Sequence, residues 1–159
     1  MAILAPADFL AALPRAGALI GVDPGKKRIG LAVCDPDRRV ATPLDMITRG
    51  KFAEDAAKFF AFYDSRACAG LVIGLPLNMD GSEGPSAQAA RAFARNLIAV
   101  RDVPILMWDE RLTSAAVNRA LIEADASRRE RGLLVDKAAA AYLLQSALER
   151  LDKMESGGS

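Results

Sequence analysis

The chain predicts an α/β fold in which a mixed sheet carries helices on its faces. Short runs with β-branched residues come first, and apolar runs of strand length then alternate with segments whose apolar residues recur at helical spacing. The composition, 52% hydrophobic and 26% charged, is typical of a globular protein. Because 159 residues is one domain's worth of sequence, we expect residues 1–159 to form a single domain.

The first third of the chain predicts an antiparallel meander. Ala7–Leu13 is apolar-rich and lies between two prolines, so we expect a helical turn or two within an extension of residues 1–17. Three runs with β-branched residues follow, separated by the turn signals Pro24-Gly25 and Asp35-Pro36-Asp37. Tight turns between consecutive strands favour antiparallel pairing. The three predicted strands are Ala18–Asp23, Arg28–Asp35 and Arg39–Thr48.

From Lys51 onward, helices and strands are expected to alternate. Apolar residues recur at helical spacing in Lys51–Ser65, and Pro85 fits the first turn of a further helix. Gly70–Pro76 and Pro104–Asp109 are apolar runs, which indicates strands covered on both faces. The remaining predictions are a helix at Ser114–Glu123, a polar loop at Ala124–Gly132, a helix at Val135–Met154 and a flexible tail at residues 155–159.

Two residue counts exclude whole classes of site. Histidine is absent, which removes Ser-His-Asp and Cys-His catalysis and the HExxH zinc sites. Two cysteines are too few for a tetrahedral zinc site, so we expect Cys34 and Cys68 to be buried free thiols in a reducing cytosol. No apolar run approaches 18 residues and no signal peptide is visible. We therefore expect a cytoplasmic protein with no membrane span.

The net charge of +1 neither indicates nor excludes a nucleic-acid partner, because a small basic patch can be masked in the total. Basic residues cluster at Lys26-Lys27-Arg28, at Arg38-Arg39 and at Arg128-Arg129 with Arg131. Such runs are usually solvated surfaces, and we favour that interpretation for the last two clusters.

Acidic residues fall at or near the expected carboxyl ends of parallel strands, where α/β sheets bind their ligands. Asp23 ends the first strand, Asp109 and Glu110 end the last one, and Asp136 opens the C-terminal helix. Two carboxylates about 4 Å apart repel by about 4 kcal/mol at an effective dielectric of about 20, so a cluster requires a proton or a cation. Without histidine, hard oxygen ligands favour Mg²⁺ or Mn²⁺. Two such ions would support phosphodiester hydrolysis.

Each of these carboxylates also has a purely structural interpretation. Asp23 could start the turn at Pro24-Gly25, and Asp136 could be the N-cap of the last helix. Asp109 or Glu110 could pair with Arg111 at the surface. Side chains alternate along a strand, and that alternation does not decide which of these two acids is the ligand.

Four stretches closely resemble motifs of the YqgF family, also called RuvX-like Holliday junction resolvases. They occur in the family's order within roughly Leu19 to Leu151. Four motifs together are highly specific, although each alone is weak. The stretches are Asp23–Asp35, Gly74–Gly84, Asp109–Thr113 and Asp136–Ala140.

The resemblance implies an RNase H-like fold, with a mixed five-stranded sheet flanked by helices, and a bacterial cytoplasmic nuclease. The implied role is maturation of the 5′ end of pre-16S rRNA in ribosome biogenesis, with Holliday junction resolution as the alternative. The implied catalytic and metal-binding residues are Asp23, Glu110 and Asp136, which would hold two Mg²⁺ or Mn²⁺ ions. The residues implied to contact nucleic acid are Lys26, Lys27, Arg28, Asn78 and Arg111.

A rival of another class is a module that binds structured RNA and cleaves nothing, since a fold does not guarantee activity. The acidic set argues against this, because clustered negative charge would not help a pure RNA binder. A four-way junction as substrate would be handled most simply by a homodimer with two-fold symmetry.

Overall fold

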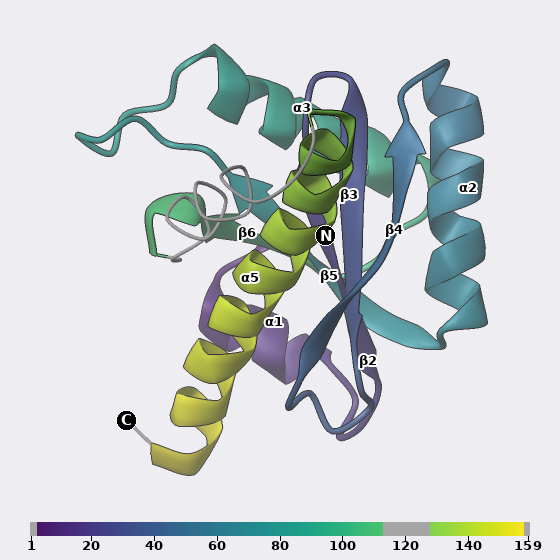
Figure 1. Ribbon diagram of the computed structural model, residues 1–159. Coiled ribbons are helices and arrows are strands. Elements are labelled where there is room, and N and C mark those ends of the chain that lie inside the picture. Colours follow the sequence, from purple (N-terminus) through teal and green to yellow (C-terminus); the bar gives the residue numbers. More distant parts are fainter. Residues whose placement is uncertain (1–2, 113–127, 158–159) are drawn as a thin grey trace.

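The computed structural model describes residues 3–112 and 128–157, and for 128–137 and 157 it describes the backbone alone. The strands are β1 (Ile3–Leu4), β2 (Ala18–Pro24), β3 (Arg28–Cys34), β4 (Ala41–Thr48), β5 (Cys68–Leu75) and β6 (Ile105–Asp109). They form one mixed sheet in the order β1-β6-β5-β2-β3-β4 (Figure 1). The first four in this order are parallel, and β3 and β4 extend the sheet from β2 as antiparallel neighbours.

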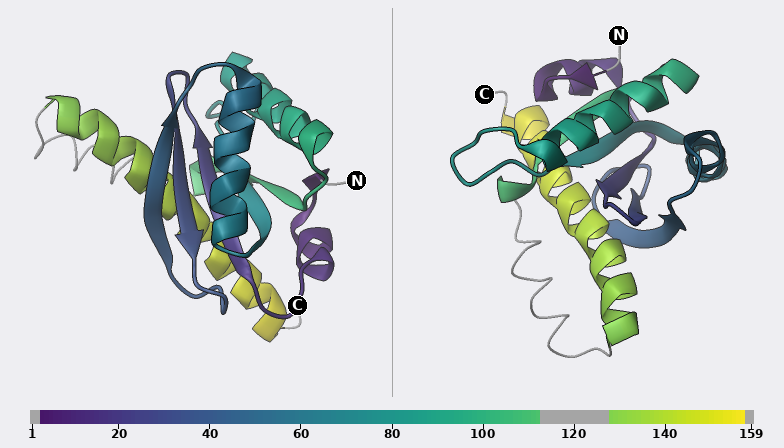
Figure 2. Two further views of the ribbon diagram at one scale, coloured as in Figure 1. Left: turned by 90° about the vertical axis from the view of Figure 1, so that its right-hand side faces the viewer. Right: turned by 90° about the horizontal axis from the view of Figure 1, so that it is seen from above.

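Helices cover both faces of this sheet (Figure 2). They are α1 (Pro6–Ala12), α2 (Phe52–Ser65), α3 (Pro85–Val100) and α5 (Arg128–Gly157), and a 3-10 turn, η1 (Glu110–Leu112), follows β6. α2 and α3 pack on one face, and α1 and α5 pack on the other. The described part of the chain contains no helix that is both long and apolar enough to cross a bilayer.

Alternation along β2 separates the two hydrophobic layers. Ile20 and Val22 are buried against the aromatic side chains of α2, including Phe59. Leu19 is buried on the opposite face with Leu144 of α5. Side chains at odd-numbered positions of β2 therefore face α5. Asp23, near the end of the strand, is at one of these positions.

The sequence-based order of elements is confirmed wherever the structure describes the chain. The antiparallel meander, the helix after Gly50, the helix that begins at Pro85 and the two buried strands all form within about two residues of their predicted bounds. The predicted helix at Ser114–Glu123 lies outside the described residues.

Three details of the prediction are wrong. The sheet has six strands rather than five, because Ile3 and Leu4 in the N-terminal extension pair with Ile105 and Leu106 of β6. The last helix begins at Arg128, within the segment predicted as a loop, since Arg, Glu and Leu are good helix formers that outweigh Gly132. The helix also continues to Gly157, beyond its predicted end at Met154.

The two cysteines are free, as the sequence predicts, with Cys34 buried and Cys68 half-buried. Strand β2 lies between the strands that carry them. Two strand spacings of about 4.8 Å place their Cα atoms beyond the roughly 7 Å that a disulfide can bridge. These two thiols consequently do not form a disulfide with each other in this fold.

Candidate active site at the carboxyl edge of the sheet

Three parallel strands, β2, β5 and β6, end at the same edge of the sheet. Asp23 is the second-last residue of β2, and Glu110 follows β6 directly as the first residue of η1. Both side chains are half-buried. The fold therefore brings two of the three predicted catalytic residues to one edge, although 86 positions separate them in the chain.

Asp23 and Glu110 line the same cavity, which has a volume of about 470 Å³. Its walls come from the β2–β3 turn, the end of β4, the segment after β5 and the first turns of α3. The other lining residues are Pro24, Gly25, Lys26, Arg49, Pro76, Pro85, Ser86 and Ala89. The cavity thus combines two carboxylates with two cationic side chains at its wall.

The carboxylate of Glu110 lies directly over Gly74, near the end of β5. A Cβ atom at position 74 would be 2.5 Å from Glu110 Oε1 and 3.1 Å from Leu143 Cδ2 of α5. Real Cβ atoms do not approach an oxygen so closely, so any side chain at this position would displace the Glu110 carboxylate from its place. Gly74 thereby provides the space in which the Glu110 side chain and α5 both approach the sheet.

Helix α5 carries the third predicted acid towards the same edge. A Cβ at Gly21 would be 2.8 Å from Leu144 Cβ and 3.1 Å from the Ala140 carbonyl oxygen, so α5 lies very close to β2 there. Asp23 is two residues further along β2, and position 136 is one helical turn before Ala140. The Asp136 side chain lies outside the described residues, and within the described part no group of three metal-binding side chains gathers.

Asp136 is not an N-cap. The interpretation that it opens the last helix is wrong, because α5 begins at Arg128 and Asp136 lies well inside it. A polar residue inside a helix has no free backbone N–H group to cap. The capping explanation for this carboxylate is therefore removed.

Asp109 has a partner of its own. Arg111 donates hydrogen bonds to both carboxylate oxygens of Asp109, the shortest 2.8 Å, and its backbone N–H also donates to Asp109 Oδ1. The side-chain hydrogen bond from Arg111 lowers the pKa of Asp109 below its ordinary value. Asp109 therefore forms the surface pair with Arg111 that the sequence allowed for either acid, while Glu110 lines the cavity.

The segment that follows β5 forms a closed loop, residues 78–84, which projects beside this edge (Figure 1). The Asn78 backbone N–H donates to the Ser82 carbonyl, and its side chain donates to Ser82 Oγ. Arg111 Nη1 donates to the Met79 carbonyl at 3.1 Å. Two predicted nucleic-acid contacts, Asn78 and Arg111, are thus also the residues that hold this loop.

The remaining predicted contacts, Lys26, Lys27 and Arg28, lie on the β2–β3 turn. Lys26 and Lys27 are exposed and Arg28 is half-buried. Of the three, only Lys26 lines the cavity that holds the two acids. The turn therefore presents positive charge at the rim of the site.

Arg49 is a cavity residue that the sequence analysis missed. Its guanidinium carbon lies 5.2 Å from the centroid of the Phe93 ring of α3, and its backbone N–H donates to the Lys27 carbonyl at 2.9 Å. A cation over an aromatic face is attracted by the ring quadrupole. Arg49 directly follows Thr48, which pairs with Arg28 of β3, so the pairing of β4 with β3 brings Arg49 beside the β2–β3 turn.

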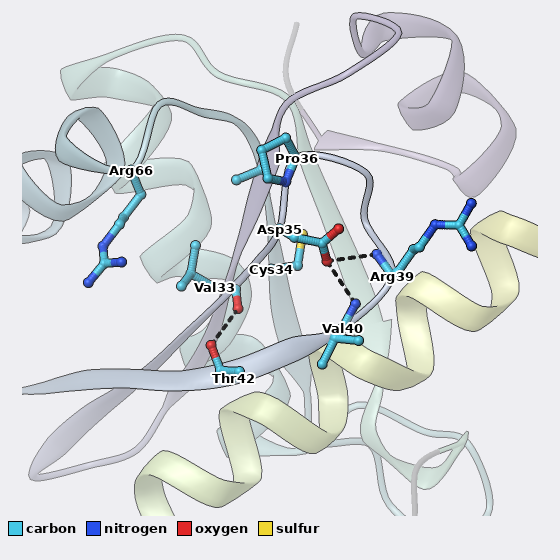
Figure 3. A pocket seen from close by; sticks show the side chains of 9 residues that line it. Val33, Cys34, Asp35, Pro36, Arg39, Val40, Thr42 and Arg66 are labelled. Carbon is cyan, nitrogen blue, oxygen red and sulfur yellow. Dashed lines mark hydrogen bonds between the residues drawn. The ribbon is translucent and has the colours of Figure 1, made fainter.

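A larger cavity, about 600 Å³, lies at the opposite end of the meander (Figure 3). The Asp35 carboxylate there accepts hydrogen bonds from the backbone N–H groups of Arg39 and Val40. Burial raises the pKa of the Cys34 thiol, so it does not have the thiolate character of a reactive cysteine. With a single carboxylate already bound to backbone donors, this cavity lacks the chemistry of the smaller one.

Comparison with known proteins places the chain among its relatives. Residues 17–150 match the protein family described as "RuvX: Holliday junction resolvase". A Cereibacter sphaeroides (strain KD131) protein is 58% identical over 145 residues, which covers 91% of each chain. A Rhodospirillum rubrum protein is 54% identical over 154 residues, or 96% of each chain. Both relatives are named as candidate pre-16S rRNA nucleases.

A similar solved structure is T. thermophilus RuvC in complex with a Holliday junction substrate. The TM-score is 0.54 at 13% sequence identity, and the match covers 86% of this chain and 96% of that one. At this identity the likeness concerns the fold alone, and the predicted RNase H-like fold is confirmed. The family match over most of the sequence, with relatives more than half identical along nine-tenths of it, shows that this chain belongs to the RuvX family.

Proposed function

We propose that this chain is a metal-dependent endonuclease that hydrolyses phosphodiester bonds at the carboxyl edge of the sheet. The observation that carries the proposal is the convergence of Asp23 and Glu110 on one cavity, from strands that are distant in the sequence. The relatives' names and the family description both concern nucleases or resolvases, which supports this class of reaction.

The residues at this edge fit a hard divalent cation. The donors are carboxylate oxygens, which Mg²⁺ and Mn²⁺ prefer, and the chain offers no histidine. Gly74 leaves the space in which Glu110 reaches the edge. Asp23, Glu110 and Asp136 would hold the ions. When bound, two such ions supply activation of the attacking water and stabilisation of the leaving oxygen.

The protein's own side chains then bind and orient the substrate strand. Lys26 and Arg49 line the cavity and are placed to donate hydrogen bonds to phosphate oxygens next to the acids. Lys27 and Arg28 extend this positive rim along the β2–β3 turn. Asn78 and Arg111 act through the loop at residues 78–84, which they hold beside the site.

The substrate we propose is pre-16S rRNA, cut in its 5′ precursor segment. Relatives at 53–60% identity are named as candidate pre-16S rRNA nucleases, which supports this choice of RNA. Holliday junction resolution is the second candidate, and the family description favours it. A junction substrate would require a homodimer to place two cavities across one branch point.

Cleavage assays test the proposal directly. Purified protein is incubated with precursor rRNA and, separately, with a four-way DNA junction, in Mg²⁺, in Mn²⁺ and in EDTA. We expect cleavage of the precursor that requires the metal and is lost in Asp23→Asn and in Glu110→Gln. Asp64→Asn is the matched control, because it removes a carboxylate that pairs with Arg101 and does not line the cavity.

Two outcomes would contradict the proposal. Equal cleavage in metal and in EDTA would exclude a metal-dependent site. RNA binding that neither EDTA nor Asp23→Asn changes, with no cleavage of either substrate, would show a binding module instead.

A further inference from the structure

Met79 is an apolar side chain that the fold leaves almost entirely in water. It is 92% exposed, whereas the next most exposed large apolar side chain in the described part of the chain, Leu112, is 64% exposed. Single exposed apolar residues are common on protein surfaces. Met79 differs because it lies in a tightly bonded loop next to a site for a polymeric substrate.

The loop that carries Met79 is held by hydrogen bonds across its base and along its length. The Gly81 backbone N–H donates to the Asn78 carbonyl at 2.8 Å, and Ser82 Oγ donates to Asp80 Oδ1 at 2.6 Å. Gly81 has a φ of +88°, which favours glycine. The exposure of Met79 is thus a consequence of a defined loop conformation.

The loop is fastened to the candidate active site through Arg111. This residue directly follows Glu110, holds the Asp109 carboxylate and donates to the Met79 carbonyl. A Cβ at Gly81 would lie 3.4 Å from Arg111 Nη1, so the guanidinium packs against the loop. The Met79 backbone is therefore bonded to the residue that directly follows Glu110.

The chemistry of the loop favours the bases of a strand over its phosphates. Its own charged residues, Asp80 and Glu83, are carboxylates, which offer a phosphate no hydrogen-bond donor, and Glu83 is already paired with Arg91. The Met79 side chain has no donor, and its flexible, polarizable thioether suits the flat apolar face of a base. Apolar side chains, methionine among them, unstack bases when they insert between steps of nucleic acid.

We propose that Met79 packs against a base of the substrate strand beside the bond that is cut, and so selects substrates whose base can be unstacked there. The proposal rests on the proposed nuclease function, because that function supplies the strand. The group that Met79 would contact is an unstacked base, which an RNA precursor or a DNA junction could equally provide.

The first test uses 2-aminopurine, whose fluorescence rises when it is unstacked. The probe is placed in turn at each position near the cleavage site of a precursor rRNA stem and of a four-way DNA junction. Binding is measured with Asp23→Asn, which prevents cleavage. We expect fluorescence to rise at one position when Met79 is present and to stay low with Asp23→Asn/Met79→Ala.

The second test measures affinity and cleavage for Met79→Ala, Met79→Gln and Met79→Leu. We expect about tenfold weaker binding for the first two, and near wild-type binding for Met79→Leu, which keeps the apolar surface. An abasic nucleotide at the responsive position should weaken binding by the wild-type protein to the level of Met79→Ala. Val40→Ala is the matched control, since Val40 is an exposed apolar residue at the opposite end of the sheet.

The results separate the inference from the function on which it rests. Suppose that the wild-type protein cleaves, and that the Met79 variants match it in affinity, in cleavage rate and in the 2-aminopurine fluorescence of the bound substrate. The inference is then overturned and the nuclease function stands. If no substrate is cut in any metal while the fluorescence response depends on Met79, the base contact stands and the nuclease does not. Absence of any fluorescence response with Met79 present would also overturn the inference.

Discussion

A missing side chain at position 74 determines where Glu110 can lie. The Glu110 carboxylate occupies the space that a Cβ on Gly74 would need, and a methyl group of Leu143 in α5 borders the same space. Sequence analysis can place Gly74 in a strand, but the close approach of a carboxylate from another strand is visible only in three dimensions.

Gly74→Ala should therefore damage activity more than stability. The new methyl group would displace the Glu110 carboxylate, and a shift of about 1 Å at a catalytic group can lower the rate about a hundredfold. Overpacking against Leu143 should cost about 1–3 kcal/mol of stability. Cleavage rate and the free energy of unfolding, measured on the same preparation, check both expectations.

Gly70→Ala is the matched control on the same strand. Its Cβ would lie 2.9 Å from Leu13 Cδ2 and 3.2 Å from the Phe9 ring, with no carboxylate nearby. We expect a similar loss of stability but an unchanged cleavage rate for the folded fraction. Equal losses of activity in both variants would show that Gly74 acts through stability alone.

At the scale of elements, the ion pair between Asp109 and Arg111 joins the end of β6 to η1 and to the loop at residues 78–84. The guanidinium holds the pKa of Asp109 below its ordinary value, so the folded protein favours the ionised carboxylate. Its contribution to stability is complete above the ordinary pKa of an aspartate and is lost as the pH falls through the lowered value.

Asp109→Asn should consequently lower the melting temperature at pH 7 by a small amount, as expected for a partly exposed ion pair. The difference between variant and wild type should begin to shrink below about pH 4, where the Asp109 carboxylate of the unfolded chain becomes protonated, and it disappears as the pH falls through the lowered pKa of the folded protein. Thermal unfolding of both proteins from pH 7 to pH 3 measures this. A difference that stays constant over this range would show that the charge of Asp109 is not involved.

A second contact between elements joins Arg49, just beyond β4, to Phe93 of α3. The ring holds the guanidinium at the cavity wall, where it is placed to bind a phosphate of the substrate. Arg49→Met should weaken nucleic-acid binding and reduce the slope of log affinity against log salt concentration by about one. Arg49→Lys should restore the slope but only part of the affinity, because lysine binds phosphate as a point charge.

Phe93→Leu should give an intermediate loss of affinity with an unchanged salt slope, because it removes the ring and keeps the charge. Arg95→Met is the matched control, since Arg95 is an exposed arginine of α3 that does not line the cavity. A slope that falls equally in Arg49→Met and Arg95→Met would mean that Arg49 contributes only to the general charge of the surface.

At the scale of the whole molecule, local patterns predicted most of the fold. Turn signals and alternation located β2 to β4, and helical spacing located α2 and α3, because these signals depend on neighbours in the sequence. The edge strand β1 was missed, because two residues carry no periodicity and pair only when β6 is already present. The start of α5 was missed because its first turns are polar and basic.

The candidate site was predictable in its acidic residues and in Lys26 of the β2–β3 turn. The positions of Asp23 and Glu110 at strand ends made them candidates, and their meeting at one cavity depends on the order β6-β5-β2 in the sheet. The contact of Arg49 with Phe93, and the closed loop that carries Met79, arise from tertiary packing that no local pattern encodes.

The central claim is that acids from β2, η1 and α5 jointly hold divalent ions. A crystal structure of the protein soaked in Mn²⁺, with the ions located by their anomalous scattering, measures this most directly. We predict Mn²⁺ coordinated by carboxylate oxygens of Asp23, Glu110 and Asp136, and its loss in crystals of Asp23→Asn. If Mn²⁺ at a saturating concentration binds only elsewhere and leaves Asp23 and Glu110 without a metal, the central claim is contradicted.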